Sequence, residues 1–187
     1  ALPHVSLTAW QALIEHAKLA AGQTVLIHGA AGGVGHVAVQ LAKACGARVI
    51  GTGSRNIDFV RELGVDQAID YAVTPFENAV RDVDVVLDTV GGDTQDRSWG
   101  VLRPGGVLVS VIQAPSQEAA AAHGVNAAMV AASPPIGKVM TELAELVDAG
   151  KIRPHVSTIF LLEQMREAHR VVEGKHSRGK VAIQVSQ

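Results

Sequence analysis

The segment that most constrains the fold of this chain is a glycine-rich run at positions 29–35, which reads GAAGGVG. A short apolar stretch at 25–27 precedes the run, and apolar residues recur at helical spacing from 34 to 45. This order predicts a strand, a tight turn and a helix. Such a turn aims unpaired backbone N–H groups and the positive end of the helix dipole at one point, and a diphosphate fits there.

The run matches the dinucleotide-binding pattern G-x-G-x-x-G imperfectly, because Ala30 stands where the first glycine is usual. Gly32 would allow a pyrophosphate to approach the backbone, and Gly35 would allow the helix to pack close to the strand. The alternative is an ordinary glycine-rich turn, and the strand and helix around the run argue against it. The predicted cofactor-binding residues of this turn are Ala31, Gly32, Gly33, Val34 and Gly35.

The rest of the chain alternates between apolar runs typical of buried strands and amphipathic stretches typical of helices. The expected strands lie at 25–29, 48–53, 67–70, 84–89, 107–112 and 125–131. The expected helices lie at 7–20, 34–45, 57–63, 94–102, 116–123 and 136–148, the last opened by Pro134 and Pro135. This alternation predicts a parallel sheet with right-handed crossovers. We therefore expect an α/β fold, a Rossmann doubly wound sheet of six strands in the order 3-2-1-4-5-6.

The last part of the chain has a different pattern. It predicts a strand at 155–160, a helix at 161–173 and a strand at 180–185. We therefore divide the chain into a Rossmann domain with an N-terminal helix at 1–154 and a short C-terminal β-α-β tail at 155–187. The tail is too small to have a core of its own, so it must pack on something else, in this chain or outside it.

The end of the second predicted strand indicates which dinucleotide binds. It reads Thr52-Gly53-Ser54-Arg55-Asn56 and holds no acidic residue to accept hydrogen bonds from the ribose of NAD. Ser54 can donate to a phosphate oxygen, and Arg55 can form a bidentate, charge-assisted pair with a 2′-phosphate. The simplest inference is that the cofactor is NADP(H). The alternative is that the segment only caps the next helix, with Asn56 as the N-cap.

The ends of the fourth and fifth strands should also border the ligand, because open α/β sheets bind ligands outside the carboxyl ends of their strands. On this ground Thr89, Val90 and Val111 are predicted cofactor contacts, and the last should lie near the nicotinamide. Asp88 is either a buried structural acid that caps neighbouring N–H groups or a ligand contact, and the sequence leaves both open.

Composition excludes several classes of function. The net charge of −2 gives no attraction to nucleic acid or to an anionic membrane, and the apolar runs are too short to span a bilayer. The single Cys45 excludes an internal disulfide and a cysteine-rich zinc site, and we expect it to be a small core residue. The eight histidines form no metal-binding cluster in the sequence, so no metal is predicted. We expect a soluble, cytoplasmic protein.

Four stretches together resemble one protein family. They are LTAWQAL at 7–13, the glycine run with its helix at 30–43, LDTVGG at 87–92 with LRPGG at 102–106, and GKHSRGKV at 174–181. These residues are similar to the medium-chain dehydrogenase/reductase superfamily. The closer likeness is to its zinc-free quinone oxidoreductase branch, the zeta-crystallin-like NADPH reductases, and the likeness covers nearly the whole chain.

The resemblance implies NADPH-dependent reduction of a quinone or of a double bond conjugated to a carbonyl group. It also implies further cofactor contacts. Tyr71 matches a position near the adenosine phosphate, and Arg178 and Lys180 match a terminal basic motif that approaches the cofactor. The alternatives are a half-buried aromatic residue at a strand end for Tyr71 and a solvated face for Arg178 and Lys180.

Family members carry a barrel-like catalytic domain ahead of the cofactor domain, and these residues hold no such domain. We therefore expect an excised cofactor domain or a remnant of one, which reduces quinones poorly by itself. The apolar side of the tail would then be exposed or pair with another copy in a homodimer. No residue is predicted to be catalytic. The alternatives are a non-catalytic NADPH-binding module or sensor, and a fragment of a zinc-containing alcohol dehydrogenase or of a polyketide enoyl reductase. A methyltransferase-like adenosine binder is disfavoured by the missing acid.

Overall fold

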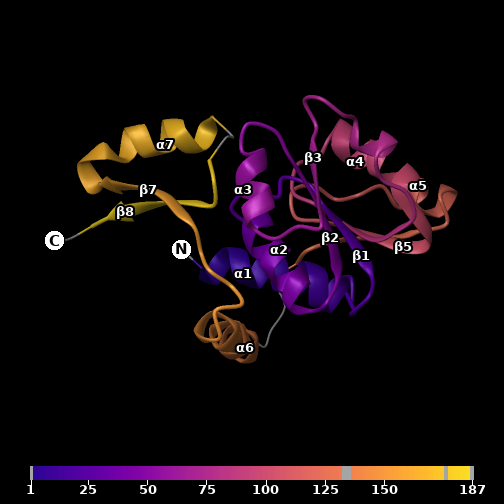
Figure 1. Cartoon of the computed structure of the whole chain (residues 1–187), viewed down its shortest axis with the longest axis horizontal. Helices are drawn as coiled ribbons and strands as arrows, with labels where there is room; N and C mark the ends of the chain where they lie inside the picture. Colours follow the sequence, from indigo (N-terminus) through magenta and orange to yellow (C-terminus); the bar gives the residue numbers. More distant parts are fainter. Residues whose placement is uncertain (1, 132–135, 175–176, 186–187) are drawn as a thin grey trace.

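The computed structural model describes residues 2–131, 136–174 and 177–185. Within these ranges, six strands form one sheet in the order β3-β2-β1-β4-β5-β6 (Figure 1). Every pairing in it is parallel, so the predicted Rossmann topology is confirmed. The strands are β1 (Thr24–Ile27), β2 (Arg48–Gly53), β3 (Gln67–Asp70), β4 (Val83–Asp88), β5 (Leu102–Ser110) and β6 (Asn126–Met129).

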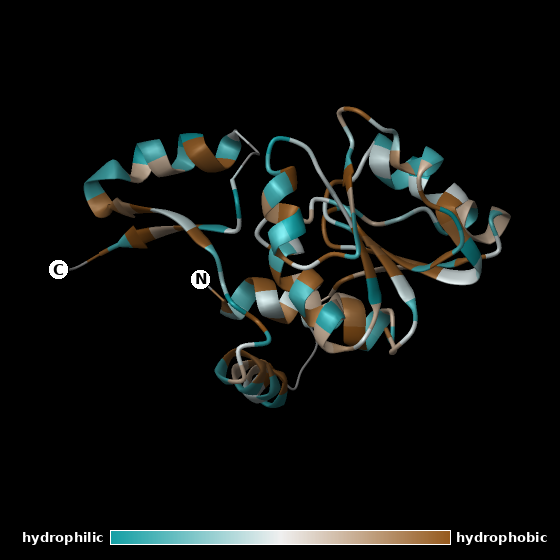
Figure 2. Ribbon diagram, in the orientation of Figure 1, coloured by the Kyte–Doolittle hydropathy of each residue, from teal (hydrophilic) through white to brown (hydrophobic). Residues whose placement is uncertain are grey.

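Helices cover both faces of this sheet (Figure 1). One face carries α1 (Pro3–Trp10), α2 (Gly35–Ala44), α3 (Ile57–Glu62) and α6 (Ile136–Asp148), and the other carries α4 (Asp93–Ser98) and α5 (Gln117–Ala122). Successive residues of a strand point to opposite faces, so Val85 and Leu87 enter the first core and Val86 enters the second. Figure 2 shows the strands as hydrophobic stretches between the two helical layers.

The first helix differs from the prediction at both ends. It begins at Pro3, not at residue 7, because proline is tolerated in the first turn of a helix. It continues as a π-helix over Gln11–His16 and ends well before residue 20. Lys18 then adopts a positive φ of 51°, and Leu19 turns back to bury its side chain in the core.

The fifth strand is also longer at its start than predicted. The preceding helix α4, predicted to reach residue 102, ends at Ser98, and a 3-10 turn covers Trp99–Val101. Strand β5 then runs through the Pro-Gly-Gly sequence at 104–106. The register shifts where β4 meets this sequence, between Val83 and Val85. Gly105 has a φ of +75°, so a glycine-rich irregularity is built into the strand, and the prediction that the sequence would lie outside it was wrong.

The C-terminal tail has the predicted strand, helix and strand. It contains β7 (Val156–Leu161), a 3-10 turn over Leu162–Gln164, α7 (Met165–Glu173) and β8 (Lys180–Gln184), and β7 and β8 pair in parallel. This unit projects away from the six-stranded sheet (Figure 1). Pro134 and Pro135 lie outside the described residues.

Candidate functional site

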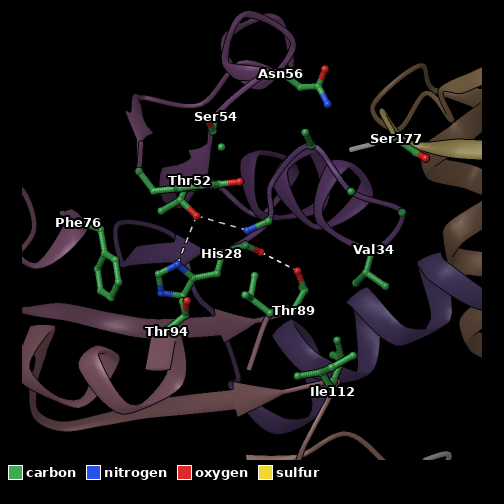
Figure 3. Close-up of a pocket in the computed structure, with 18 of the residues that line it drawn as sticks. His28, Val34, Thr52, Ser54, Asn56, Phe76, Thr89, Thr94, Ile112 and Ser177 are labelled. Carbon is green, nitrogen blue, oxygen red and sulfur yellow. Dashed lines mark hydrogen bonds between the residues drawn. The ribbon is translucent and has the colours of Figure 1, made fainter. Parts of the chain in front are cut away.

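A cavity of about 890 Å³ lies at the carboxyl ends of β1, β2 and β4. Figure 3 shows side chains from several loops that converge on it. The predicted residues that line it are Ala31, Gly32, Gly33, Val34, Ser54, Arg55, Tyr71, Thr89, Val90, Val111 and Lys180. Two predicted residues, Gly35 and Arg178, are not in its lining.

The glycine-rich turn forms one wall of the cavity. Gly29 has a φ of +64°, and the N–H of Gly32 donates to its carbonyl oxygen over 2.9 Å. A Cβ atom on Gly35 would collide with that same carbonyl, so Gly35 lies behind the turn and allows the close approach of helix and strand. In the described part of the chain, the N–H groups of Gly33 and Val34 donate to no other residue. They are the free donors that an anion needs at a helix start.

The end of β2 forms a second wall. The Ser54 side chain is half-buried and Arg55 is exposed, and neither side chain pairs with another residue that the structure describes. Asn56 stands at the N-cap of α3, yet its side chain makes no capping hydrogen bond. The reading of this segment as a helix cap is therefore wrong for Asn56, and the hydroxyl and guanidinium groups remain available to a ligand.

The structure decides between the two readings of Asp88. Its carboxylate is fully buried and accepts hydrogen bonds from the N–H groups of Val90 and Gly91. The Gln95 amide and the Ser110 hydroxyl donate to the other oxygen. Asp88 is therefore the structural acid that shapes the loop after β4 and not a residue of the cavity lining.

His28 is a lining residue for which the sequence predicted no ligand role. Its ring is 1% exposed and lies between the hydroxyls of Thr52 and Ser98. Burial lowers the pKa of His28 to about 4, against a smaller opposite effect of Asp88. The ring is therefore neutral near pH 7, as expected of a satisfied core histidine. For His28, the signal in the sequence that could have placed it at the cavity is its position at the end of an apolar strand.

Phe76 and Arg97 complete the far wall of the cavity, and neither was predicted. The guanidinium of Arg97 lies 4.9 Å from the centre of the Phe76 ring and pairs with the Glu77 carboxylate over 2.9 Å. These residues follow β3 and β4, so only the fold brings them together. No sequence motif marks them.

The root of the tail closes the site over the glycine-rich turn. The N–H of Gly179 donates to the carbonyl of Ala31 over 2.8 Å, and the Lys180 side chain lies against Gly33. His36 donates from Nδ1 to the Gly32 carbonyl, so its Nε2 accepts the N–H of His155 over 3.3 Å. Lys180 therefore lines the cavity, whereas Arg178 is exposed outside it.

The charge of the described lining is positive. Arg55, Arg97 and Lys180 line the cavity and no carboxylate does, although Glu77 neutralises one of these charges. Across residues 2–131, 136–174 and 177–185, no three His, Cys, Asp or Glu side chains gather as metal ligands would. Over the same ranges no helix is long and apolar enough to cross a bilayer.

An open, doubly wound parallel sheet with a cavity at the carboxyl ends of its central strands places this protein among the Rossmann-type α/β proteins. A family model described as zinc-binding dehydrogenase matches residues 63–183. The chain therefore belongs to this family of the medium-chain dehydrogenase/reductase superfamily, as the sequence motifs predicted.

Curated and structural relatives agree with this assignment. The zebrafish (Danio rerio) mitochondrial NAD(P)H oxidoreductase RTN4IP1 is 34% identical over 215 residues, covering 98% of this chain and 56% of that protein. The quinone oxidoreductase from Coxiella burnetii matches with a TM-score of 0.89 at 38% identity, over 98% of this chain and 59% of that one.

The Escherichia coli quinone oxidoreductase complexed with NADPH matches with a TM-score of 0.84 at 25% identity, over 97% of this chain and 63% of that one. This chain thus spans little more than half the length of the relatives that it matches.

Proposed function

We propose that this chain is the NADPH-binding part of an oxidoreductase that transfers hydride to a quinone or to a conjugated enone or enoyl substrate. The observation that carries the proposal is the cavity itself. It is lined by unpaired N–H groups at the start of α2 and by the side chains of Ser54 and Arg55, and no carboxylate lines it. Two relatives support the same reading, since one is named an NAD(P)H oxidoreductase and another was solved with NADPH.

The residues present fit the two charged ends of such a cofactor. The N–H groups of Gly33 and Val34, with the ammonium of Lys180, would hold the diphosphate. Ser54 and Arg55 would hold the 2′-phosphate, because a hydroxyl and a planar guanidinium both donate to phosphate oxygens. Tyr71 is 54% exposed at the rim, where it would flank the adenosine.

When bound, the nicotinamide supplies the hydride. The chain would orient the ring and exclude water with an apolar wall of Val90, Val111 and Ile112. Val90 and Ile112 are 52% and 56% exposed, so they have surface that a ring can cover. His28 is unsuited to donate a proton near pH 7, because burial lowers its pKa to about 4. No described residue is proposed as catalytic.

Fluorescence titration of the chain with each reduced cofactor tests the proposal. Charge-assisted hydrogen bonds to the 2′-phosphate should make the affinity for NADPH at least about tenfold higher than the affinity for NADH. Arg55→Asp should remove most of this preference. Arg61→Asp is the matched control, because this substitution makes the same change of charge on α3, at a residue that does not line the cavity. Equal affinity of the unaltered chain for both cofactors would contradict the proposal.

We further propose that the chain acts as one part of a longer enzyme, with the substrate held largely by the remainder. The share of the relatives' length that it spans supports this. The homodimer and the lack of nucleic-acid and membrane partners stay predictions. The expected cytoplasmic location also stays a prediction, because the zebrafish relative is named mitochondrial.

A further inference from the structure

A chain of hydrogen bonds beneath the cavity fixes the direction in which the Thr52 hydroxyl points its proton. The series of hydrogen bonds runs from the Thr94 carbonyl through Ser98 and His28 to Thr52 and Gly29. Figure 3 shows the two hydrogen bonds that Thr52 makes, to the His28 ring and to the N–H of Gly29. All of these groups are buried or half-buried, so each proton in this series is donated to a neighbour within it. The donors and acceptors can therefore be assigned one after another.

The direction starts at a carbonyl oxygen, which only accepts. The Ser98 hydroxyl is 2.6 Å from the Thr94 carbonyl and therefore donates its single proton there. Ser98 must then accept from Nε2 of His28, 2.9 Å away, so the neutral ring carries its proton on Nε2. Nδ1 of the same ring is left as an acceptor.

Thr52 is the next group in this series of hydrogen bonds. Its hydroxyl lies 3.3 Å from the Nδ1 acceptor of His28 and donates its proton to it. The N–H of Gly29 donates to the same hydroxyl oxygen over 3.3 Å. A hydroxyl has one proton and two lone pairs, so Thr52 retains one lone pair and no proton for a ligand. Since Thr52 lines the cavity, it can recognise only a hydrogen-bond donor.

We propose that Thr52 is a specificity-determining residue that accepts a hydrogen bond from the 3′-hydroxyl of the cofactor's adenosine ribose. The proposal rests on the proposed function. Thr52 and Ser54 are two residues apart and both line the cavity. If Ser54 and Arg55 hold the 2′-phosphate, the neighbouring ribose carbon carries the 3′-hydroxyl, which is the donor that this ribose retains. Thr52 thus takes the accepting role of the absent acidic residue without repelling a phosphate as a carboxylate would.

The test compares two ligands that differ by one hydroxyl. Adenosine 2′,5′-bisphosphate, which is the adenosine half of NADPH, and its 3′-deoxy counterpart are titrated into the chain by calorimetry. The 3′-hydroxyl should strengthen binding about three- to tenfold, the range of one neutral hydrogen bond. Titration with NADPH in the same buffer tests the proposed function separately.

Variants locate the effect on the Thr52 oxygen. Thr52→Val keeps the shape of the side chain, and the affinity ratio of the two ligands should fall to about one, as one neutral hydrogen bond is lost. Thr52→Ser keeps the hydroxyl and should keep the ratio. Thr141→Val makes the same change on α6 outside the cavity and should leave the ratio unaltered.

The ratio separates recognition from stability, because a merely structural loss weakens both ligands equally. Equal binding of the two ligands by the unaltered chain would overturn the inference even if Thr52→Val does not fold. A ratio that persists in Thr52→Val would also overturn it. If neither NADPH nor the bisphosphate binds, the proposed function fails and the inference fails with it.

Discussion

The six-stranded sheet and the C-terminal tail bury their apolar residues very differently. In the sheet, Leu26 and Val86 are fully buried between helices on both faces. In the tail, Ile159 is 64% exposed and Leu161 is 50% exposed, although both lie in a strand. Figure 2 shows the hydrophobic strands of the sheet between layers of helices, whereas the two strands of the tail lie beside α7 alone. The comparison shows that the sheet has a complete core, whereas the tail owes its position to a few contacts at its root.

The largest expected difference comes from the same substitution in the two regions. Leu26→Ala should lower the free energy of unfolding by about 2–5 kcal/mol, because it leaves a cavity in a closed core. Leu161→Ala should lower it by about 0.5 kcal/mol or less, because half of the side chain is already in water. Urea denaturation of both variants measures the difference. A loss with Leu161→Ala as large as with Leu26→Ala would show that the tail is covered in solution.

A second prediction concerns the turn that joins the sheet to the cavity. Gly35→Ala should lower the free energy of unfolding by about 1–3 kcal/mol, because its Cβ would collide with the Gly29 carbonyl. It should also weaken NADPH binding, since the turn must shift to relieve the collision. Gly100→Ala is the matched control, because an added Cβ there meets nothing within 4 Å. Thermal denaturation that gives the two variants equal melting temperatures would contradict this account of the turn.

The smallest expected effect concerns the root of the tail and depends on pH. Burial lowers the pKa of His36, with Lys180 and His155 adding smaller effects in the same direction and the Gly32 and Gly33 backbone opposing them. The neutral form accepts the His155 N–H, and a proton on Nε2 would break that hydrogen bond. Its contribution to stability is therefore complete above the ordinary pKa of 6.5 and is lost as the pH falls from there toward the lowered value.

Hydrogen exchange of the His155 amide, corrected for the intrinsic rate, measures this contribution. Protection should fall by up to about tenfold between pH 7.5 and pH 5, in line with the loss of one hydrogen bond. The amide of Leu26 in the sheet serves as the internal reference. A constant protection of the His155 amide over this range would contradict the assigned role of His36.

The sequence predicted the parts of the fold that depend on local pattern. Strands such as β1 and β4 contain short apolar runs, and the alternation of strands and helices together with the glycine-rich turn was enough for the strand order. Prediction from the sequence failed where several local structures compete. The Pro-Gly-Gly sequence at 104–106 normally breaks a strand, yet here β4 pairs with β5 on both sides of it, at Leu102 and at Val107. Likewise, the first helix ends early because burial of Leu19 outweighs helix periodicity.

The candidate site was predictable where it follows the carboxyl ends of strands. Ser54, Arg55 and Thr89 were found in this way, since topology alone places such residues at one edge of the sheet. Lys180 was found only through the family resemblance, because its approach to Gly33 depends on how the tail folds back. The pairing of Phe76 with Arg97 was missed, as it depends on two loops that meet only in three dimensions.

The most direct measurement of the central claim is a crystal structure of the chain soaked with NADPH. The account predicts the diphosphate at the N–H groups of Gly33 and Val34 and the 2′-phosphate on Ser54 and Arg55. A cofactor whose diphosphate lies away from the glycine-rich turn, or whose 2′-phosphate touches neither Ser54 nor Arg55, would contradict it.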